Sequence, residues 1–199
     1  MAKLKLTKNE LKKQKDNLKM FNRYLPNLVL KKMQLQMEIR AVEQKIFNLE
    51  LQKEQIIKSF NKWIAVFTDR DVFTQDILKI TEVFTKEGNI AGVNIPIFER
   101  AEFVVAEYDL IEKPLWLDIA VETVKKILTL DLEMQILEQQ KALLGKELKT
   151  TTQRVNLFEK IKIPEAKANI KMIRVYLGDQ QTAAVVRGKI AKRGMEASQ

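Results

Sequence analysis

The residue types that most often carry out enzyme chemistry are missing or badly spaced in this sequence. Its 199 residues include no His and no Cys, which excludes a Cys/His zinc site, thiolate chemistry and a histidine general base. Gly145 and Lys146 are followed by Glu147 instead of Ser or Thr, and they lack the upstream glycine of a phosphate-binding loop. One acidic cluster lacks the glycine and the bidentate glutamate of a calcium loop, and a turn at a helix end explains it better: Asp69, Asp71 and Asp76. We therefore expect no enzyme activity, no cofactor and no metal.

A seven-residue apolar repeat organises the chain from Thr7 to about residue 68. Two series of positions seven residues apart, beginning at Leu4 and at Thr7, hold fifteen apolar residues out of twenty. A stripe this narrow and this long needs a partner helix to cover it. Thr7 and Glu10 form the capping-box pattern of a helix start. Pro26 predicts a bend and not a stop, because the repeat continues across it.

The segment after this first arm has the pattern of a small β-hairpin. Residues 80–86 and 90–98 are rich in β-branched and aromatic side chains, and the turn signal Glu-Gly-Asn, centred on Gly88, separates them. Gly88 and Gly92 are the expected residues of the hairpin turn, and Gly92 within the second run also predicts a bulge. Pro96 is typical of an edge strand.

A second long helix is expected to open at Lys113 and Pro114, since proline suits the first turn of a helix. Its apolar residues again repeat by sevens, from Trp116 to Phe158, and the apolar stripe changes phase after Pro164. Three glycines predict a poor helix at the end of the chain: Gly178, Gly188 and Gly194.

These patterns predict a mainly α fold, a long antiparallel two-stranded coiled coil of the N- and C-terminal helices with a small β-hairpin segment between them. The expected divisions are an N-terminal coiled-coil arm (1–78), a hairpin and connector (79–113), and a C-terminal arm with a basic tail (114–199). The chain ends would meet at one tip, with the hairpin at the far end. Lys32 and Lys53 occupy seam positions, where such residues fix the register of paired helices.

The net charge of +9 is concentrated near the chain ends. Solubility is one interpretation. The other is a basic tip that contacts an acidic surface or nucleic acid. The residues proposed for such a tip are Lys12, Lys13, Arg187 and Lys189. Lysines interrupt the first apolar residues and no run of 18 apolar residues occurs, so we expect neither a signal peptide nor direct membrane insertion.

One motif in the second arm resembles a known family. Arg154, Val155 and Asn156, followed by Pro164 within an Ile-Pro pair, are similar to the signature of the central-stalk D-subunit family of V-type ATPases and the related A-type ATP synthases. The opening helix and residues 89–96 also look like segments of that family, in the same order. The resemblance covers nearly the whole chain.

The resemblance implies a non-catalytic rotor shaft that couples rotation of the membrane ring to changes at the nucleotide sites of the head. It implies three kinds of partner: the catalytic and non-catalytic head subunits around the shaft, the small central-stalk F subunit, and the funnel-shaped stalk subunit above the membrane ring. It also implies no nucleic acid and a cytoplasmic location, peripheral to the membrane. The hairpin end, residues 80–98, would then face the stalk.

Two other functions are compatible with a basic coiled coil. A prefoldin-like chaperone subunit also has a helix, β-hairpin, helix order, but it would need hairpins of several chains to assemble. A nucleic-acid-binding coiled coil would bind with a steep salt dependence. The aromatic residues are not interleaved with the basic ones, which disfavours this function.

Overall fold

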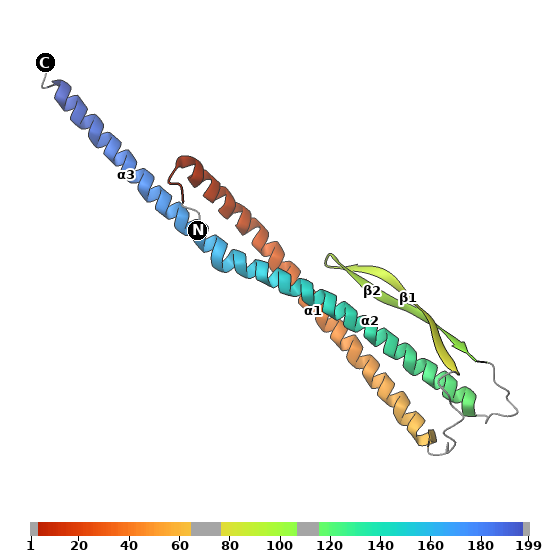
Figure 1. Cartoon of the computed structure of the whole chain (residues 1–199). Helices are drawn as coiled ribbons and strands as arrows, with labels where there is room; N and C mark the ends of the chain where they lie inside the picture. The colour runs from red at the N-terminus through yellow and green to blue at the C-terminus, as the bar shows by residue number, and fades with distance from the viewer. Residues whose placement is uncertain (1–3, 65–76, 107–115, 197–199) are drawn as a thin grey trace. The chain divides into compact units, whose positions relative to one another are not determined.

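The fold is mainly α, as predicted, with two long helices packed together and a two-stranded antiparallel hairpin between them in the sequence (Figure 1). The computed structural model describes residues 4–64, 77–106 and 116–196. Helix α1 spans Lys8–Ile64, and the returning chain forms α2 (Trp116–Asn156), a π-helix η1 (Leu157–Lys162) and α3 (Ile163–Glu196). The chain divides into two compact units, residues 1–32 with 150–199, and residues 33–149.

Helix α1 begins where its capping residues predict. The hydroxyl oxygen of Thr7 accepts a hydrogen bond from the backbone N–H of Glu10, at 3.3 Å, which satisfies one of the free donors of the first turn. The carboxylate of Glu10 does not reach back to complete a capping box; it accepts a hydrogen bond from the Gln14 amide at 2.8 Å. The helix continues through Pro26 without interruption.

In the unit of residues 33–149, the core forms where the two seven-residue repeats meet. Leu35 and Val42 of α1 and Leu137 and Leu144 of α2 belong to one buried cluster, and Leu35 and Leu144 are completely inaccessible to solvent. Ile95 of the hairpin completes the cluster. The apolar seam predicted from spacing is therefore the packed seam of the helices.

Two ion pairs between α1 and α2 show that the helices run antiparallel. Lys53 Nζ lies 2.6 Å from a carboxylate oxygen of Asp131, and Lys141 Nζ lies 2.8 Å from one of Glu43. Moving towards the N-terminus on α1 therefore means moving towards the C-terminus on α2. Lys53 thus has a charged partner on the opposite helix, and its role in fixing the register stays a prediction.

The hairpin is longer than predicted and turns at a different place. Strands β1 (Leu78–Ile90) and β2 (Val93–Val105) are joined by Ala91 and Gly92, whose φ angles are 51° and 79°. Two consecutive positive φ angles are the mark of a type I′ turn, whose twist matches that of the strands. The expected turn at Gly88 is wrong, since this residue lies within β1 opposite Ile95. The bulge expected at Gly92 is also wrong.

Register irregularities occur farther from the turn, between Ile80 and Glu82 and between Phe84 and Thr85. The Asn89 side chain explains the position of the turn. Its oxygen accepts from the Gly92 N–H at 3.1 Å, and its amide donates to the Asn94 side chain at 2.7 Å. These bonds close the loop around Ala91 and Gly92.

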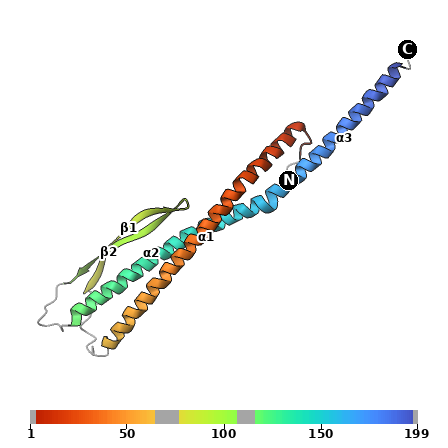
Figure 2. The ribbon, with the colours of Figure 1, turned by 180° about the vertical axis from the view of Figure 1, so that it is seen from behind.

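The hairpin packs along the helices of the unit of residues 33–149. Near the turn, Ile90, Val93 and Ile95 pack on the cluster around Leu35. At the opposite end of the hairpin, a second cluster contains Ile77, Leu78 and Val105 of the hairpin segment with Trp116, Leu117 and Val121 of α2. Figures 1 and 2 show β1 and β2 beside α2 from opposite sides. The expected boundary between residues 113 and 114 lies outside the described residues, as do the three aspartates of the acidic cluster.

In the unit of residues 1–32 and 150–199, a wider helical turn interrupts the repeat. Covered positions on the returning chain step by seven from Thr151 to Phe158, by eight to Ala166, and by seven again to Ile173. The eight-residue step coincides with η1, where the Ile163 N–H donates to the carbonyl of Phe158 five residues back. A π-helical turn accommodates one extra residue, so the apolar stripe stays on the same side.

The same π-helix relieves Pro164, which in a regular helix would clash with the carbonyl four residues earlier. Phe158 of η1 packs against Phe21 of α1, with the centres of the two rings 5.2 Å apart. The apolar stripe therefore does change phase, but it does so at η1, before Pro164 and not after it as expected.

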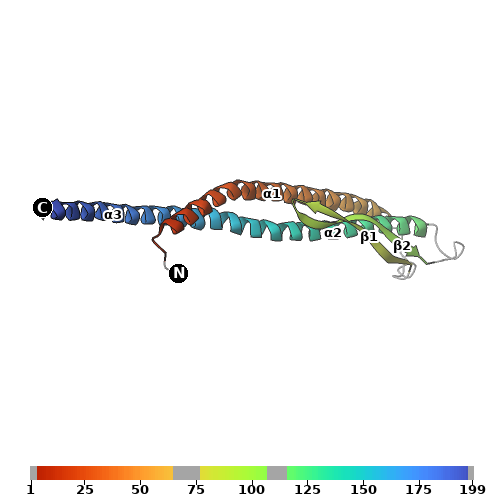
Figure 3. The same cartoon turned by 90° about the horizontal axis from the view of Figure 1, so that it is seen from above.

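The last part of α3 differs from the expected poor helix. The helix continues to Glu196 through all three glycines. Every residue from 178 to 195 is exposed, whereas Leu177 is half-buried. Figure 3 shows α3 continuing past the start of α1. This end of the helix has no described helix of its own chain beside it.

Candidate functional site

The described residues form no metal centre. Among residues 4–64, 77–106 and 116–196, no three His, Cys, Asp or Glu side chains gather closely enough to hold a metal ion. Gln140 is a buried polar residue, and its side-chain amide donates to the Pro96 carbonyl, which ties the hairpin to α2. In the described part, every buried side-chain nitrogen or oxygen has a hydrogen-bond partner.

The four residues predicted for a basic tip lie in the same compact unit, but in two different parts of it. Lys12 and Lys13 are exposed on α1, in the stretch where it pairs with the returning helix. Arg187 and Lys189 are exposed on the part of α3 whose residues are all uncovered. The structure thus separates the predicted tip into a paired part and an extension.

The residues of the motif in the second arm have two different environments. Val155 is buried in the seam, with 5% of its surface exposed, whereas Arg154 and Asn156 on either side of it are exposed. The motif ends where η1 begins, and Pro164 follows that π-helix directly. Val155 therefore contributes to packing, and Arg154 and Asn156 are available to a partner.

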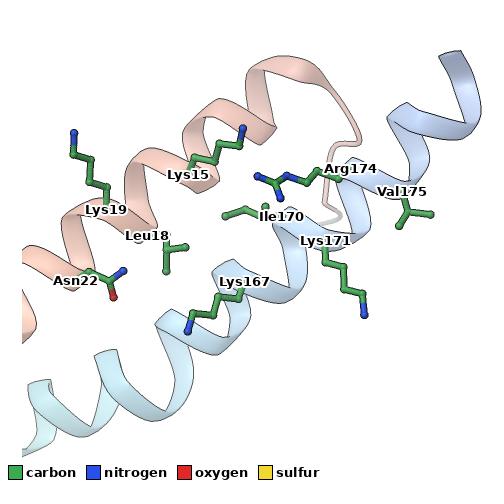
Figure 4. A pocket seen from close by; sticks show the side chains of 9 residues that line it. All are labelled: Lys15, Leu18, Lys19, Asn22, Lys167, Ile170, Lys171, Arg174 and Val175. Carbon is green, nitrogen blue, oxygen red and sulfur yellow. The ribbon is translucent and has the colours of Figure 1, made fainter.

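A basic groove that was not predicted from the sequence lies between α1 and α3 in the unit of residues 1–32 and 150–199. Its volume is about 650 Å³, and its lining contains five basic residues and no acidic residue. Leu18 of α1 and Ile170 of α3 lie at its centre, and Figure 4 shows their side chains between the two helices. The complete lining consists of Lys15, Leu18, Lys19, Asn22, Lys167, Ile170, Lys171, Arg174 and Val175.

The signal for this groove was present in the sequence as charges beside the seam. Lys15 and Lys19 flank Leu18 on α1, and Lys167 and Lys171 flank Ile170 on α3, each three positions before or one after the seam residue. Such positions border the interface of paired helices. That both basic pairs line the same groove follows only from the packing.

The sequence is similar to known proteins over nearly its whole length. A family model for the D subunit of ATP synthase matches residues 10–193. The V-type ATP synthase D subunit of Borreliella burgdorferi is 53% identical over 197 residues, covering 98% of this chain and 96% of the relative. The chain belongs to the ATP synthase D-subunit family. More distant members are similar over the same extent: the V-type relative from Chlamydia trachomatis is 32% identical over 98% of the chain and 97% of its own length, and that from Chlamydia muridarum is 30% identical over 98% and 97%.

For this member of the D-subunit family, the described helices include none whose length and apolar character would let it cross a bilayer.

Proposed function

We propose that this chain is the central rotor shaft of a V-type ATP synthase, a non-catalytic component that couples rotation of the membrane ring to changes at the nucleotide sites of the head. The observation that carries the proposal is the match to the D-subunit family over residues 10–193. The proposal includes a cytoplasmic location, with attachment to the membrane only through other subunits.

The dissimilarity of the two long helical segments supports this role. One is the continuous helix α1, while the other is divided by η1, and the hairpin packs on only part of their surface in the unit of residues 33–149. A shaft without rotational symmetry presents different surfaces to equivalent sites around it. Contacts that differ in free energy between states are sufficient to couple rotation to those sites.

The uncovered end of α3 supports a surrounding partner. Residues 178–195 include four basic residues and one acidic residue, and their apolar side chains, such as Val185 and Ile190, are exposed. An isolated helix of this length is marginal in water, and glycines weaken it further. We propose that the head subunits enclose this segment together with Lys12 and Lys13.

The remaining partners are assigned by the same proposal. The small central-stalk F subunit and the funnel-shaped stalk subunit would contact the unit of residues 33–149, including the hairpin, and no nucleic acid would bind. A prefoldin-like assembly is not favoured, because the core of the hairpin is already covered by helices of its own chain: Ile95 is 2% exposed. A chaperone barrel would require that face to be free for other chains.

A single-molecule rotation experiment tests the rotor role. Because the chain has no cysteine, Lys86→Cys on the exposed part of β1 gives one attachment point for a bead. Gly88 is unsuitable, since a Cβ there would overlap the Ile97 side chain. With the head fixed to a surface, ATP should make the bead rotate in one direction, while complexes with the cysteine-free chain should bind no bead at this point. Steady ATP hydrolysis with a stationary bead would overturn the proposal.

A further inference from the structure

The basic groove between α1 and α3 has an excess of positive charge. No acidic residue lines it. No ion pair among the described residues involves any of its five cations, whereas Lys53, Lys141 and Lys162 each pair with a carboxylate. Figure 4 shows Arg174 extending from α3 towards α1, on the side of Lys15. Five cations that line one groove without a paired carboxylate raise the positive potential there, so an anionic partner would be attracted to it.

The centre of the groove is aliphatic. Ile170 is 7% exposed and Leu18 is half-buried, while Val175 at the edge of the lining is 59% exposed. Aliphatic contacts combined with a basic rim fit a peptide that carries both aliphatic and acidic side chains. None of the nine lining residues is aromatic, so bases would find no ring to stack on, which disfavours single-stranded nucleic acid.

A second groove of the same chain has the opposite charge. In the unit of residues 33–149, a groove of about 470 Å³ is lined by four acidic residues and a single lysine, Lys53, which is paired with Asp131. An acidic segment would be repelled there. Charge therefore distinguishes the two grooves, and only the one in the unit of the chain ends is complementary to an acidic partner.

We propose that the basic groove is the docking site of an acidic, aliphatic segment of a neighbouring subunit in the assembled complex. Its aliphatic side chains would contact Leu18 and Ile170, and its carboxylates would pair with the surrounding lysines and Arg174. The inference rests on the proposed rotor role, which supplies the neighbours. Pairs at an open groove are weak individually and are screened by salt, so such a contact can form and break as the shaft turns.

Cross-linking in the assembled complex tests the site. Val175→Cys places a unique cysteine at the groove, to which a short photoreactive label is attached before mass spectrometry identifies the linked peptide. We expect one predominant peptide in which Asp and Glu outnumber Lys and Arg. Raising the salt from about 0.1 M to about 1 M, which shortens the Debye length from about 10 Å to about 3 Å, should reduce the yield about tenfold or more.

Two matched variants separate the groove from general charge effects. In the Val175→Cys background, Lys15→Gln, Lys19→Gln and Lys171→Gln together should lower the yield about as much as high salt. The control triple of Lys5→Gln, Lys8→Gln and Lys160→Gln removes the same charge from exposed positions outside the groove and should leave the yield within about twofold.

Several results would overturn the docking site. These are a linked peptide that is basic or neutral, a link to nucleic acid, or a yield that the groove triple leaves unchanged. The bead assay on the same preparations separates the two proposals. Rotation without an acidic cross-link refutes only the docking site, whereas hydrolysis without rotation refutes the rotor role itself.

Discussion

Replacing Ile95 by alanine is expected to detach the hairpin from the helices. Ile95 is 2% exposed and belongs to a cluster with Leu35, Val42, Leu137 and Leu144. The substitution removes three buried carbons, whose transfer from water is worth about 0.8 kcal/mol each. The cavity left among these four side chains adds a further term, and buried Ile→Ala changes cost about 2–5 kcal/mol in total. We expect a loss of about 3 kcal/mol in the free energy that holds the hairpin in place.

Amide hydrogen exchange is the appropriate assay, because the hairpin can open without unfolding of the helices. A loss of about 3 kcal/mol corresponds to exchange about a hundredfold faster for the amides of β1 and β2 when exchange follows the opening equilibrium. Amides of α1 before residue 30 belong to the other compact unit and should change little.

The matched control is Ile97→Ala, two residues along the same strand. Ile97 is 43% exposed, so the same substitution should cost about 1 kcal/mol or less. Equal acceleration of exchange in the two variants, or no acceleration in Ile95→Ala, would refute the packing of the hairpin described above.

Three further predictions concern the turn, the π-helix and the basic tip. Ala91→Gly should stabilise the hairpin by about 1 kcal/mol, because alanine is strained at a φ of 51° and glycine is not; a loss of stability in urea unfolding would contradict this. Deleting Glu159 from η1 should cost about 3 kcal/mol, since Pro164 then meets a regular helical turn, and Pro164→Ala added to the deletion should recover most of that loss. Equal stability of the single and double changes would disprove this account of η1. Neutralising the basic tip should lower the ratio of ion transport to ATP hydrolysis in the complex, and unchanged coupling would exclude a contact between this tip and the head. The residues to be neutralised together are Lys12, Lys13, Arg187 and Lys189.

The seam of the helices could be predicted from the spacing of apolar residues, and the position of the hairpin turn could not. A seven-residue repeat has one geometric solution, a narrow stripe covered by another helix, and Leu35 and Leu144 occupy it. The hairpin segment offered two glycines as turn signals, Gly88 and Gly92. Local propensity did not decide between them. The side-chain bonds of Asn89 and the burial of Ile95 fix the register in which the second signal forms the turn.

The end of α3 shows a similar limit. Its glycines lower helix propensity, and the sequence therefore predicts a poor helix, yet the helical backbone continues to Glu196. A phase change of the apolar stripe near Pro164 was visible in the sequence, but its position before the proline and its π-helical form were not. A π-helix is one of several ways to absorb one extra residue, and the choice depends on which side chains must remain on the seam.

The sequence alone determined the helical pairing, the hairpin between the helices, the absence of His and Cys chemistry, and the resemblance to the D-subunit family. These properties depend on residue types and on spacing within one segment. Only the tertiary structure decided that the hairpin lies along the helices and that lysines from both ends of the chain line one groove. Such features arise where side chains from segments about 150 residues apart meet, and no local pattern specifies the rotation of one helix face against another.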